Sequence, residues 1–254
     1  MLVMERYERI VQWVNERGSI RVSELSELCG VTEETIRRDL DRLEQAGRLK
    51  RSHGGAVSIK EQQHETPHTE REIAHMEEKK RIAAEAVLLI EPRDRIILDA
   101  STTAWYMASI LPDIPLTVLT NSIQVAIALS AKERVEVIST GGTLAPRSMS
   151  YVGPLAERSL ESYHVDKAFI SCKGIHLERG ISETNEQQAI IKSRMIGMAE
   201  QVYLLADYSK FGLKTFAHVA DLTKVDTIIT DDKIDDVFQA RLRELDVRVQ
   251  IAAL

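Results

Sequence analysis

The sequence predicts an α/β protein with two domains, a small and mostly helical one at the N-terminus and a larger one with a mostly parallel sheet after it. Residues 1–57 carry apolar side chains at helical spacing, whereas short apolar runs alternate with amphipathic segments from residue 79 onward. Such alternation is typical of a parallel sheet with helices on both faces. The chain has 254 residues and 44% hydrophobic content, which is enough for two ordinary globular domains.

The first expected element is a helix that ends at Gly18. Apolar residues repeat at helical spacing before this glycine, at Met4, Tyr7, Ile10, Val11 and Val14. We expect this helix to pack beneath the two that follow it. Residues 20–22 could form a short strand that pairs with the wing, the extended segment at residues 48–57.

Two helices joined by a tight turn come next. The shorter has apolar residues at Val22, Leu25 and Leu28, and the longer has them at Ile36, Leu40 and Leu43. Gly30 suits the turn between them, and Thr32 suits the N-cap of the longer helix. After Gly47, residues 48–57 form two short extended pieces around a basic tip. These elements predict a winged helix-turn-helix domain over residues 1–57.

Charge is unevenly distributed along the chain. The formal net charge is −6, so the whole chain is not a generic nucleic-acid-binding polycation. Between Arg37 and Arg51, however, six basic residues stand against Asp39, Asp41 and Glu44. This local excess on the longer helix and the wing favours docking at one DNA site over coating DNA.

The first domain resembles the DNA-binding domain of the DeoR family of bacterial sugar-metabolism regulators. The family motif is present as Thr35 to Leu40 (TIRRDL), Leu43-Glu44 and His53 to Ala56 (HGGA). The resemblance implies a recognition helix in the major groove of double-stranded operator DNA, with wing and flanking residues on phosphates. The expected DNA contacts are Thr35, Arg37, Arg38, Arg42, Lys50, Arg51 and His53. Glu33 departs from the family's small hydroxyl residue, and we expect it to point away from DNA.

Polar and charged residues dominate between residues 58 and 78, which we interpret as a solvated linker between the domains. His64, His68 and His75 raise the alternative of a metal site. Pro67 disrupts the necessary geometry, and no set of carboxylates or thiols completes the site. We therefore expect no metal and no other cofactor.

Residues 79–254 predict a Rossmann-like α/β domain. Its expected strands lie at 96–98, 116–119, 135–138, 168–170, 202–206, 227–229 and 247–251. Its expected helices lie at 79–90, 104–111, 122–129, 187–200 and 235–245. Ligands of such sheets bind beyond the carboxyl ends of the strands.

Polar residues follow five of these strands at that edge. Hydroxyl groups and free backbone N–H groups at helix N-termini suit a phosphate, and lysines add charge to it. Carboxylate and amide side chains suit sugar hydroxyl groups, although each loop taken singly is more often a simple turn or cap. Together they predict a site for a phosphorylated sugar or polyol at Asp99, Ser101, Thr102, Thr103, Thr120, Asn121, Gly141, Gly142, Lys173, Glu183, Asp207 and Lys210.

This domain is similar to the DeoR-type sensor domain, whose fold resembles ribose-phosphate isomerases and CoA transferases. The similarity lies in five motifs: Asp99 to Thr103, Thr120-Asn121, Gly141-Gly142, Val165 to Ala168 with Gly174, and Asp207 to Gly212 (DYSKFG). Two residues depart from the family pattern, Ser101 where Gly is frequent and Gln188 where Glu is frequent. Glu183 and Asn185 lie in a loop that could close over a ligand or remain solvated, and Lys192 follows on the next helix.

The expected function is transcription regulation, more specifically repression of a carbohydrate-catabolism operon, with release by a phosphorylated metabolite. Two half-sites on an operator require two heads, so we expect a homo-oligomer, a dimer or tetramer, assembled through the sensor domain. No apolar run reaches about 20 residues, and neither a signal peptide nor paired cysteines are evident, so we expect a cytoplasmic protein without membrane contact.

Two other functions remain open from the sequence. A sugar-phosphate isomerase of similar fold could use Asp99, Glu183 or Lys173 as an acid or base. An architectural DNA-binding protein without an effector is the other possibility, and it predicts no thermal shift with any sugar phosphate. The identity of the effector, the operator sequence and the choice between activation and repression are not encoded in any motif that we recognise.

Overall fold

A computed structural model describes residues 3–17, 19–52, 54–57 and 65–252. The chain divides into two compact units, Met1–Glu65 and Thr66–Leu254, and each is described by itself. His53 and His64 lie outside the described residues.

The first unit has the order of elements that the sequence predicts. It consists of α1 (Val3–Arg17), β1 (Ser19–Arg21), α2 (Val22–Cys29), α3 (Glu33–Gln45), β2 (Lys50–Ser52) and β3 (Gly55–Val57). Ile36, Leu40 and Leu43 of α3 are buried in its core together with Ile10 and Val14 of α1, as expected. Met4 and Leu28 are exposed instead, because each lies at the edge of its apolar stripe.

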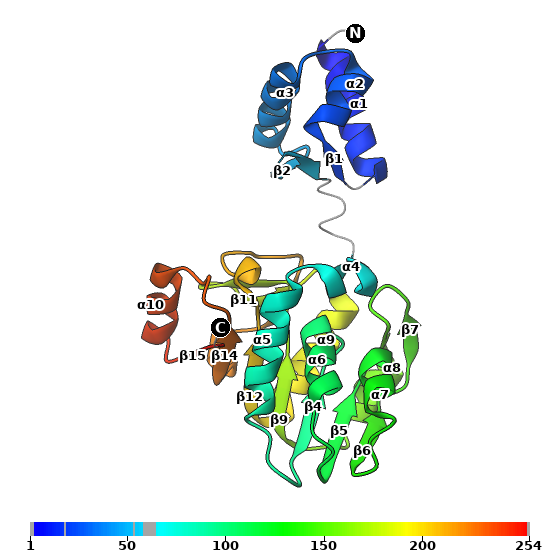
Figure 1. The fold of residues 1–254 in the computed structure, drawn as a ribbon, viewed down its shortest axis with the longest axis vertical. Helices are drawn as coiled ribbons and strands as arrows, with labels where there is room; N and C mark the ends of the chain where they lie inside the picture. Colours follow the sequence, from blue (N-terminus) through cyan, green and yellow to red (C-terminus); the bar gives the residue numbers. More distant parts are fainter. Residues whose placement is uncertain (1–2, 18, 53, 58–64, 253–254) are drawn as a thin grey trace. The chain divides into compact units, whose positions relative to one another are not determined.

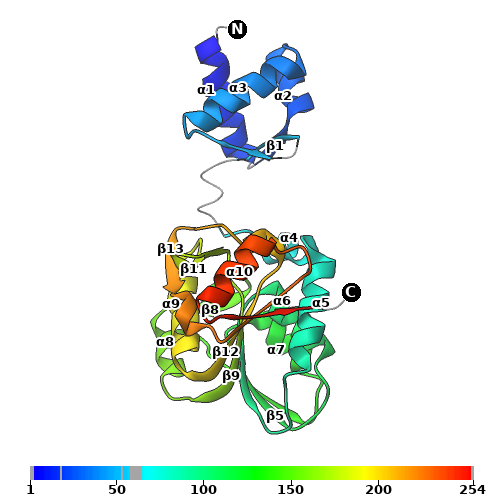
Figure 2. The same cartoon turned by 90° about the vertical axis from the view of Figure 1, so that its left-hand side faces the viewer.

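The turn and the wing follow from local chemistry. Gly30 ends α2 in the left-handed conformation (φ 63°), which glycine adopts without steric cost. The Thr32 hydroxyl accepts a hydrogen bond from the Thr35 N–H and caps α3. The three strands pair antiparallel in the order β1-β3-β2, which confirms the pairing expected for Ile20 and Arg21, whereas Val22 begins α2. Figure 2 shows β1 at the base of this unit, below α1, α2 and α3.

A buried ion pair joins α1 to α3. Arg6 Nε lies 2.6 Å from Asp39 Oδ2, and Arg6 Nη2 lies 3.2 Å from Asp39 Oδ1. Both side chains are more than nine-tenths buried. The hydrogen bond that Arg6 donates to Asp39 raises the pKa of Arg6 against the opposing effect of burial. Asp39 therefore belongs to the core of the head, although the sequence presents it as one of several acids on a surface helix.

The second unit is built on a parallel sheet. Within its described residues, seven strands lie in the order β15-β14-β12-β9-β4-β5-β6 (Figure 1). All neighbouring pairs are parallel, and each strand overlaps one of the predicted apolar runs. The strands are β4 (Arg95–Leu98), β5 (Leu116–Thr120), β6 (Val135–Ser139), β9 (Val165–Ile170), β12 (Ala199–Leu205), β14 (Thr227–Thr230) and β15 (Arg248–Ile251).

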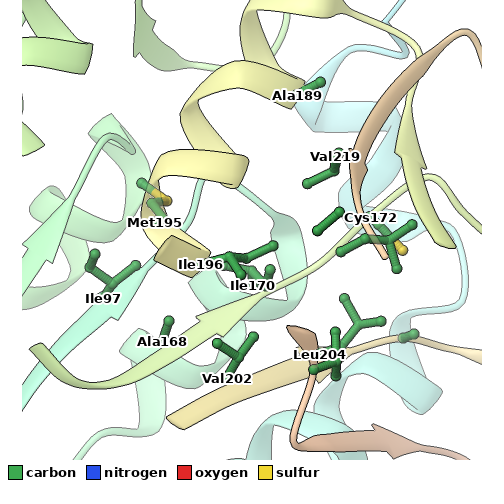
Figure 3. Packing of buried hydrophobic residues seen from close by; sticks show 14 of the residues in the cluster. Ile97, Ala168, Ile170, Cys172, Ala189, Met195, Ile196, Val202, Leu204 and Val219 are labelled. Carbon is green, nitrogen blue, oxygen red and sulfur yellow. The ribbon is translucent and has the colours of Figure 1, made fainter. Parts of the chain in front are cut away.

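Helices cover both faces of this sheet, as predicted. One group is α5 (Met76–Val87), α6 (Thr102–Ile110) and α7 (Ile123–Leu129); the other is α8 (Pro154–Leu160), α9 (Glu186–Gly197) and α10 (Asp236–Glu244). Ile96 and Leu98 of β4 pack with the first group, and Ile97 between them packs with the second. Figure 3 shows Met195 and Ile196 of α9 in this second layer.

Several elements were not predicted. They are the hairpin of β7 (Thr143–Ala145) and β8 (Ser150–Val152), the small sheet of β10 (Gly174–His176), β11 (Gly180–Glu183) and β13 (Ala217–Ala220), and helices α4 (His68–Ile73) and α8. These segments are short, and their apolar residues are too few to show a period.

The prediction of a solvated linker over residues 58–78 is wrong from Thr66 onward, because helix α4 and the start of α5 lie there. Residues from Thr66 onward belong to the second unit. His68 is 3% exposed. Its backbone N–H donates to the Arg147 carbonyl oxygen at 2.7 Å, and its imidazole ring packs edge-on against Trp105. Burial is the main cause that lowers the pKa of His68. The second unit therefore begins at Thr66, and residues 66–78 are not part of a linker.

Candidate functional site

The exposed face of α3 in the first unit carries the predicted recognition residues. The side chains of Arg37 and Arg38 are 47% and 74% exposed. Arg37 Nη2 lies 2.6 Å from Glu33 Oε2, and Arg38 Nε lies 3.3 Å from Glu34 Oε1. Ion pairs in water are weak, so both guanidinium groups can exchange a carboxylate for a phosphate at small free-energy cost.

The remaining candidates of the head extend from α3 to the wing. Arg42 donates to the Tyr7 hydroxyl at 3.1 Å, and the Thr35 hydroxyl lies 3.0 Å from that of Thr32. Arg51 on β2 pairs with Asp41, and its N–H donates to Glu44 Oε1 at 2.8 Å. These contacts attach the wing to the recognition helix. Lys50 is exposed beside Arg51.

The order of strands in the second unit places a topological switch between β4 and β9. From β4 the chain continues outward to β5 and β6, and from β9 it continues the other way to β12, β14 and β15. The loops after β4 and β9 diverge at such a point, and ligands of open α/β sheets bind there.

Asp99 follows β4 at this switch and is 1% exposed. Its carboxylate accepts hydrogen bonds from the Ser101 N–H (3.0 Å), the Ser171 N–H (2.9 Å) and Lys192 Nζ (2.6 Å). The N–H of Ser171 belongs to the loop after β9, so one carboxylate ties the two diverging loops together.

Lys192 of α9 is the centre of a buried charge network. Its Nζ also lies 3.1 Å from Glu183 Oε1 and donates to the Ser171 carbonyl oxygen at 2.6 Å. Burial opposes its charge, but the ion pairs to Asp99 and Glu183 outweigh this effect and raise the pKa of Lys192. Two predicted site residues thus share one lysine that the predicted set omits.

Some predicted hydroxyl groups act as caps and turns. Ser101 accepts from the Ala104 N–H and caps α6, and Thr120 accepts from the Ser122 N–H. Thr102 and Thr103 form the first turn of α6, where backbone N–H groups have no acceptor within the helix. These N–H groups make the start of α6 suitable for an anion.

Asn121 and Gly142 differ in what they offer to a ligand. Asn121 donates through Nδ2 to the Tyr151 carbonyl oxygen, and its buried Oδ1 has no partner among the described residues. Gly141 and Gly142 have φ angles of 60° and 119°. A Cβ on Gly142 would lie 2.8 Å from the Val152 carbonyl oxygen, so close packing explains this glycine, whereas Gly141 faces open space.

Lys173 and Lys210, both predicted for phosphate, share their surroundings with two cations that the sequence did not single out. Arg71 of α4 and Lys79 of α5 complete a set that we call the cation cluster, Arg71, Lys79, Lys173 and Lys210. Burial, followed by the charge of Lys210, lowers the pKa of Lys79 to about 8. The same two causes lower the pKa of Lys173.

The cation cluster is short of negative charge. Asp207 opposes the cations, and its carboxylate lies 3.8 Å from Lys210 Nζ. Glu183 also acts on Lys173, but it is paired to Lys192. Arg71 Nε and Nη2 and Asp207 Oδ2 are buried and find no hydrogen-bond partner in the part of the chain that the structure describes. Buried polar atoms are almost always paired, so this neighbourhood is suited to a further, anionic group.

Arg71 and Lys79 were missed for different reasons. Arg71 falls in a polar stretch that we interpreted as linker; the available signal was Pro67 followed by residues with adequate helix propensity. Lys79 stands at the start of a predicted helix, where lysine is usually solvated. Nothing in its sequence context indicates that it is 4% exposed.

The described residues contain no group of three or more His, Cys, Asp and Glu side chains that could hold a metal ion. No helix among them combines the length and apolar character that a membrane span requires.

Comparisons with known proteins match both units. Residues 6–62 match the DeoR-like helix-turn-helix domain, and residues 74–232 match the DeoR C terminal sensor domain. The chain is 56% identical to the uncharacterized HTH-type transcriptional regulator YulB of Bacillus subtilis, over 100% of this chain and 98% of the relative. It is 40% identical to the L-fucose operon activator of Haemophilus influenzae, over 95% of this chain and 97% of the relative.

A further relative and one solved structure complete the comparison. The chain is 37% identical to the putative aga operon transcriptional repressor of Escherichia coli O157:H7, over 96% of this chain and 92% of the relative. Ribose 5-phosphate isomerase A of Methanocaldococcus jannaschii overlaps 54% of this chain and 55% of its own, with 17% identity and a TM-score of 0.41. This last likeness concerns the α/β fold alone.

Proposed function

Because this chain belongs to the DeoR family of helix-turn-helix transcriptional regulators of sugar operons, we propose that it represses a carbohydrate-catabolism operon and that a phosphorylated sugar or polyol releases it from the operator. The family is not one of enzymes, so the isomerase alternative is set aside. The observation that carries the proposal is a partly buried cation cluster, short of negative charge, in the same chain as an exposed basic recognition helix.

The head would contact DNA through the exposed face of α3 and through the wing. Thr35, Arg37, Arg38 and Arg42 would face the major groove and its flanking phosphates, and Lys50, Arg51 and His53 would hold the backbone. The support is the exposure of the α3 arginines and the weakness of their ion pairs to Glu33 and Glu34.

The sensor would hold the phosphate group with Lys173, Lys210 and the first-turn N–H groups of α6. Asn121 Oδ1 and Asp207 Oδ2 would accept hydrogen bonds from sugar hydroxyl groups, since both are buried acceptors without a hydrogen-bond partner in the described chain. Ser101, Thr120 and Gly142 would shape the loops, and Asp99, Glu183 and Lys192 would hold the switch point rigid.

Release from the operator would follow from thermodynamic coupling between effector binding at the sensor and operator binding at the head. A ligand that binds the sensor more tightly in the DNA-free arrangement weakens operator binding by the same coupling free energy, typically ~1–3 kcal/mol. Two heads are needed for two half-sites, so the working form would be a homo-oligomer, a dimer or tetramer, in the cytoplasm where the operator lies. The names of the relatives include both an activator and a putative repressor. We favour repression because it requires only that ligand binding and operator binding oppose each other.

A panel experiment tests the proposal. Operator fragments obtained by selection from genomic DNA would be bound by the full chain in a gel-shift assay, and phosphorylated sugars and polyols would be added beside their unphosphorylated counterparts. We expect at least one phosphorylated compound to release the DNA while its unphosphorylated counterpart does not. Transcription in vitro from the same fragment should fall with the protein and recover with that compound; a rise with the protein would contradict repression.

A second candidate is an architectural DNA-binding protein without an effector. It predicts that no phosphorylated compound changes the thermal unfolding midpoint. A shift of several degrees with one compound would exclude it, because only a ligand that binds the folded state raises that midpoint.

A further inference from the structure

Side chains of α5 and α6 hold helix α4 in place by hydrogen bonds to its main-chain carbonyl oxygens. The Lys79 ammonium group donates to the carbonyl oxygens of Arg71 and Ala74, the latter at 2.6 Å. The Tyr106 hydroxyl of α6 donates to the Glu72 carbonyl oxygen at 3.1 Å. The last turn of α4 is therefore attached to both α5 and α6.

This attachment brings α4 to the start of α6, where the first-turn N–H groups lie. The Thr102 hydroxyl is 3.5 Å from the Arg71 carbonyl oxygen. Just before α4, the Thr66 hydroxyl is 3.5 Å from Lys173 Nζ. The segment thus spans from the loop after β9 to the N-terminus of α6.

The guanidinium group of Arg71 lacks acceptors at this place. Nε and Nη2 are buried and unpaired within the described chain. Its charged neighbours Lys79 and Lys173 are ammonium groups, which only donate hydrogen bonds. Glu183 is engaged by Lys192, and Asp207 lies next to Lys210. What this neighbourhood lacks is an acceptor with several oxygens and more than one negative charge.

A phosphate dianion has these properties. Its oxygens match the planar fork of a guanidinium group with two parallel hydrogen bonds, which an ammonium group cannot make. Its charge offsets the mutual repulsion of the cation cluster.

We propose that Arg71 binds the phosphate group of the effector together with Lys173 and Lys210, while Lys79 positions α4. The inference rests on the proposed function and adds a ligand contact from outside the strand-end loops. In the chain, α4 begins three residues after the boundary of the first unit. A phosphate on Arg71 therefore acts directly on the segment that follows the DNA-binding head.

The test uses the full chain with inorganic phosphate as the probe. The thermal unfolding midpoint is measured in potassium phosphate and in potassium chloride at equal ionic strength, and phosphate affinity is measured by calorimetry. Four proteins are compared: the wild type, Arg71→Ala, Arg71→Lys, and Arg158→Ala as a control at an exposed arginine of α8. The midpoints in chloride report whether a variant is folded.

We expect phosphate to raise the midpoint of the wild type and of Arg158→Ala equally. Arg71→Ala should bind phosphate at least tenfold more weakly, and Arg71→Lys should lie between, because lysine keeps the charge and loses the fork. If Arg71→Ala folds poorly, the phosphate affinity of Arg71→Lys compared with that of the wild type decides whether Arg71 binds phosphate.

The outcomes separate the inference from the proposed function. If phosphate affinity is unchanged in Arg71→Ala or Arg71→Lys, the role of Arg71 is overturned while the phosphate-binding sensor stands. If the wild type responds neither to phosphate nor to any phosphorylated sugar or polyol, both are overturned.

Discussion

The two units hold their positive charges in opposite ways. On the head, Arg37 and Arg38 are exposed and each is paired with a carboxylate one turn earlier. In the sensor, Lys79 is buried and Lys173 is partly buried, and Arg71 has buried guanidinium nitrogens without acceptors among the described residues. Exposed pairs in water exchange partners easily, which suits a long polyanion met one phosphate at a time. Buried cations repel each other until one compact anion arrives, which suits a small ligand.

The largest effect is expected for Arg6 and Asp39, the buried charge pair of the described head. Asp39→Ala leaves Arg6 buried without its partner and should destabilise the head by about 3–5 kcal/mol. Asp41→Ala is the control, since Asp41 pairs with Arg51 where the two side chains are 48% and 33% exposed, and its loss should cost below about 1 kcal/mol.

The two tryptophans allow this effect to be assigned to one unit. Trp13 lies in α1 of the head and Trp105 in α6 of the sensor. In a Trp105→Phe background, tryptophan fluorescence reports on the head alone, and urea unfolding gives its stability. Equal midpoints for Asp39→Ala and Asp41→Ala would show that burial does not distinguish the two pairs.

The second effect concerns pH and the sensor. The pKa of Lys79 is about 8 in the folded protein, against 10.5 for a lysine exposed to water, so between these values the unfolded chain binds more protons. Stability therefore rises with pH above about 8, by roughly 1 kcal/mol between pH 8 and pH 9 for this group. Urea unfolding of the wild type and of Lys79→Met at several pH values isolates the contribution.

Bound phosphate should oppose the effect of burial on the pKa of Lys79. The anion favours the charged form of Lys79, so phosphate binding at about pH 8.5 should take up protons, which calorimetry in buffers of different ionisation enthalpy detects. Inorganic phosphate is already mostly dianionic at that pH and adds little of its own. Equal proton uptake by wild type and Lys79→Met would contradict the role of Lys79.

The smallest effect concerns the exposed pairs of the head. Glu33→Gln removes the carboxylate beside Arg37 and should lower head stability by only about 0.3–0.5 kcal/mol. Operator affinity should rise, because a negative charge is removed and Arg37 is freed for a phosphate. Gel-shift titrations at two salt concentrations measure this change, and a weaker complex would mean that Glu33 contacts DNA favourably.

Local patterns predicted more of the fold than of the site. Apolar spacing at Ile36, Leu40 and Leu43 located the recognition helix, and short apolar runs located every described strand of the parallel sheet. The strand-end residues Asp99 and Asn121 also follow from this pattern, because parallel strands end at one edge. These inferences succeed because they depend on neighbours in sequence.

What escaped prediction depends on residues far apart in the chain. Lys192 reaches Asp99 across 93 positions, and Arg6 reaches Asp39 across 33. Helix α4 contains few apolar residues and is held by Tyr106 and Lys79, so its own sequence looks like a linker. A charged side chain is assumed to be solvated until its distant partner is known.

The central claim is that exposed cations contact the operator and the partly buried cations of the sensor contact the effector. The most direct measurement determines, for both Arg38→Ala and Lys210→Ala, the affinity for the operator, the affinity for the phosphorylated compound found in the panel, and the release of the operator by that compound. The account predicts that Arg38→Ala loses operator binding and keeps its affinity for the compound, whereas Lys210→Ala keeps operator binding and resists release. Release of Lys210→Ala at the same concentration as the wild type, or loss of compound binding in a folded Arg38→Ala, would contradict it.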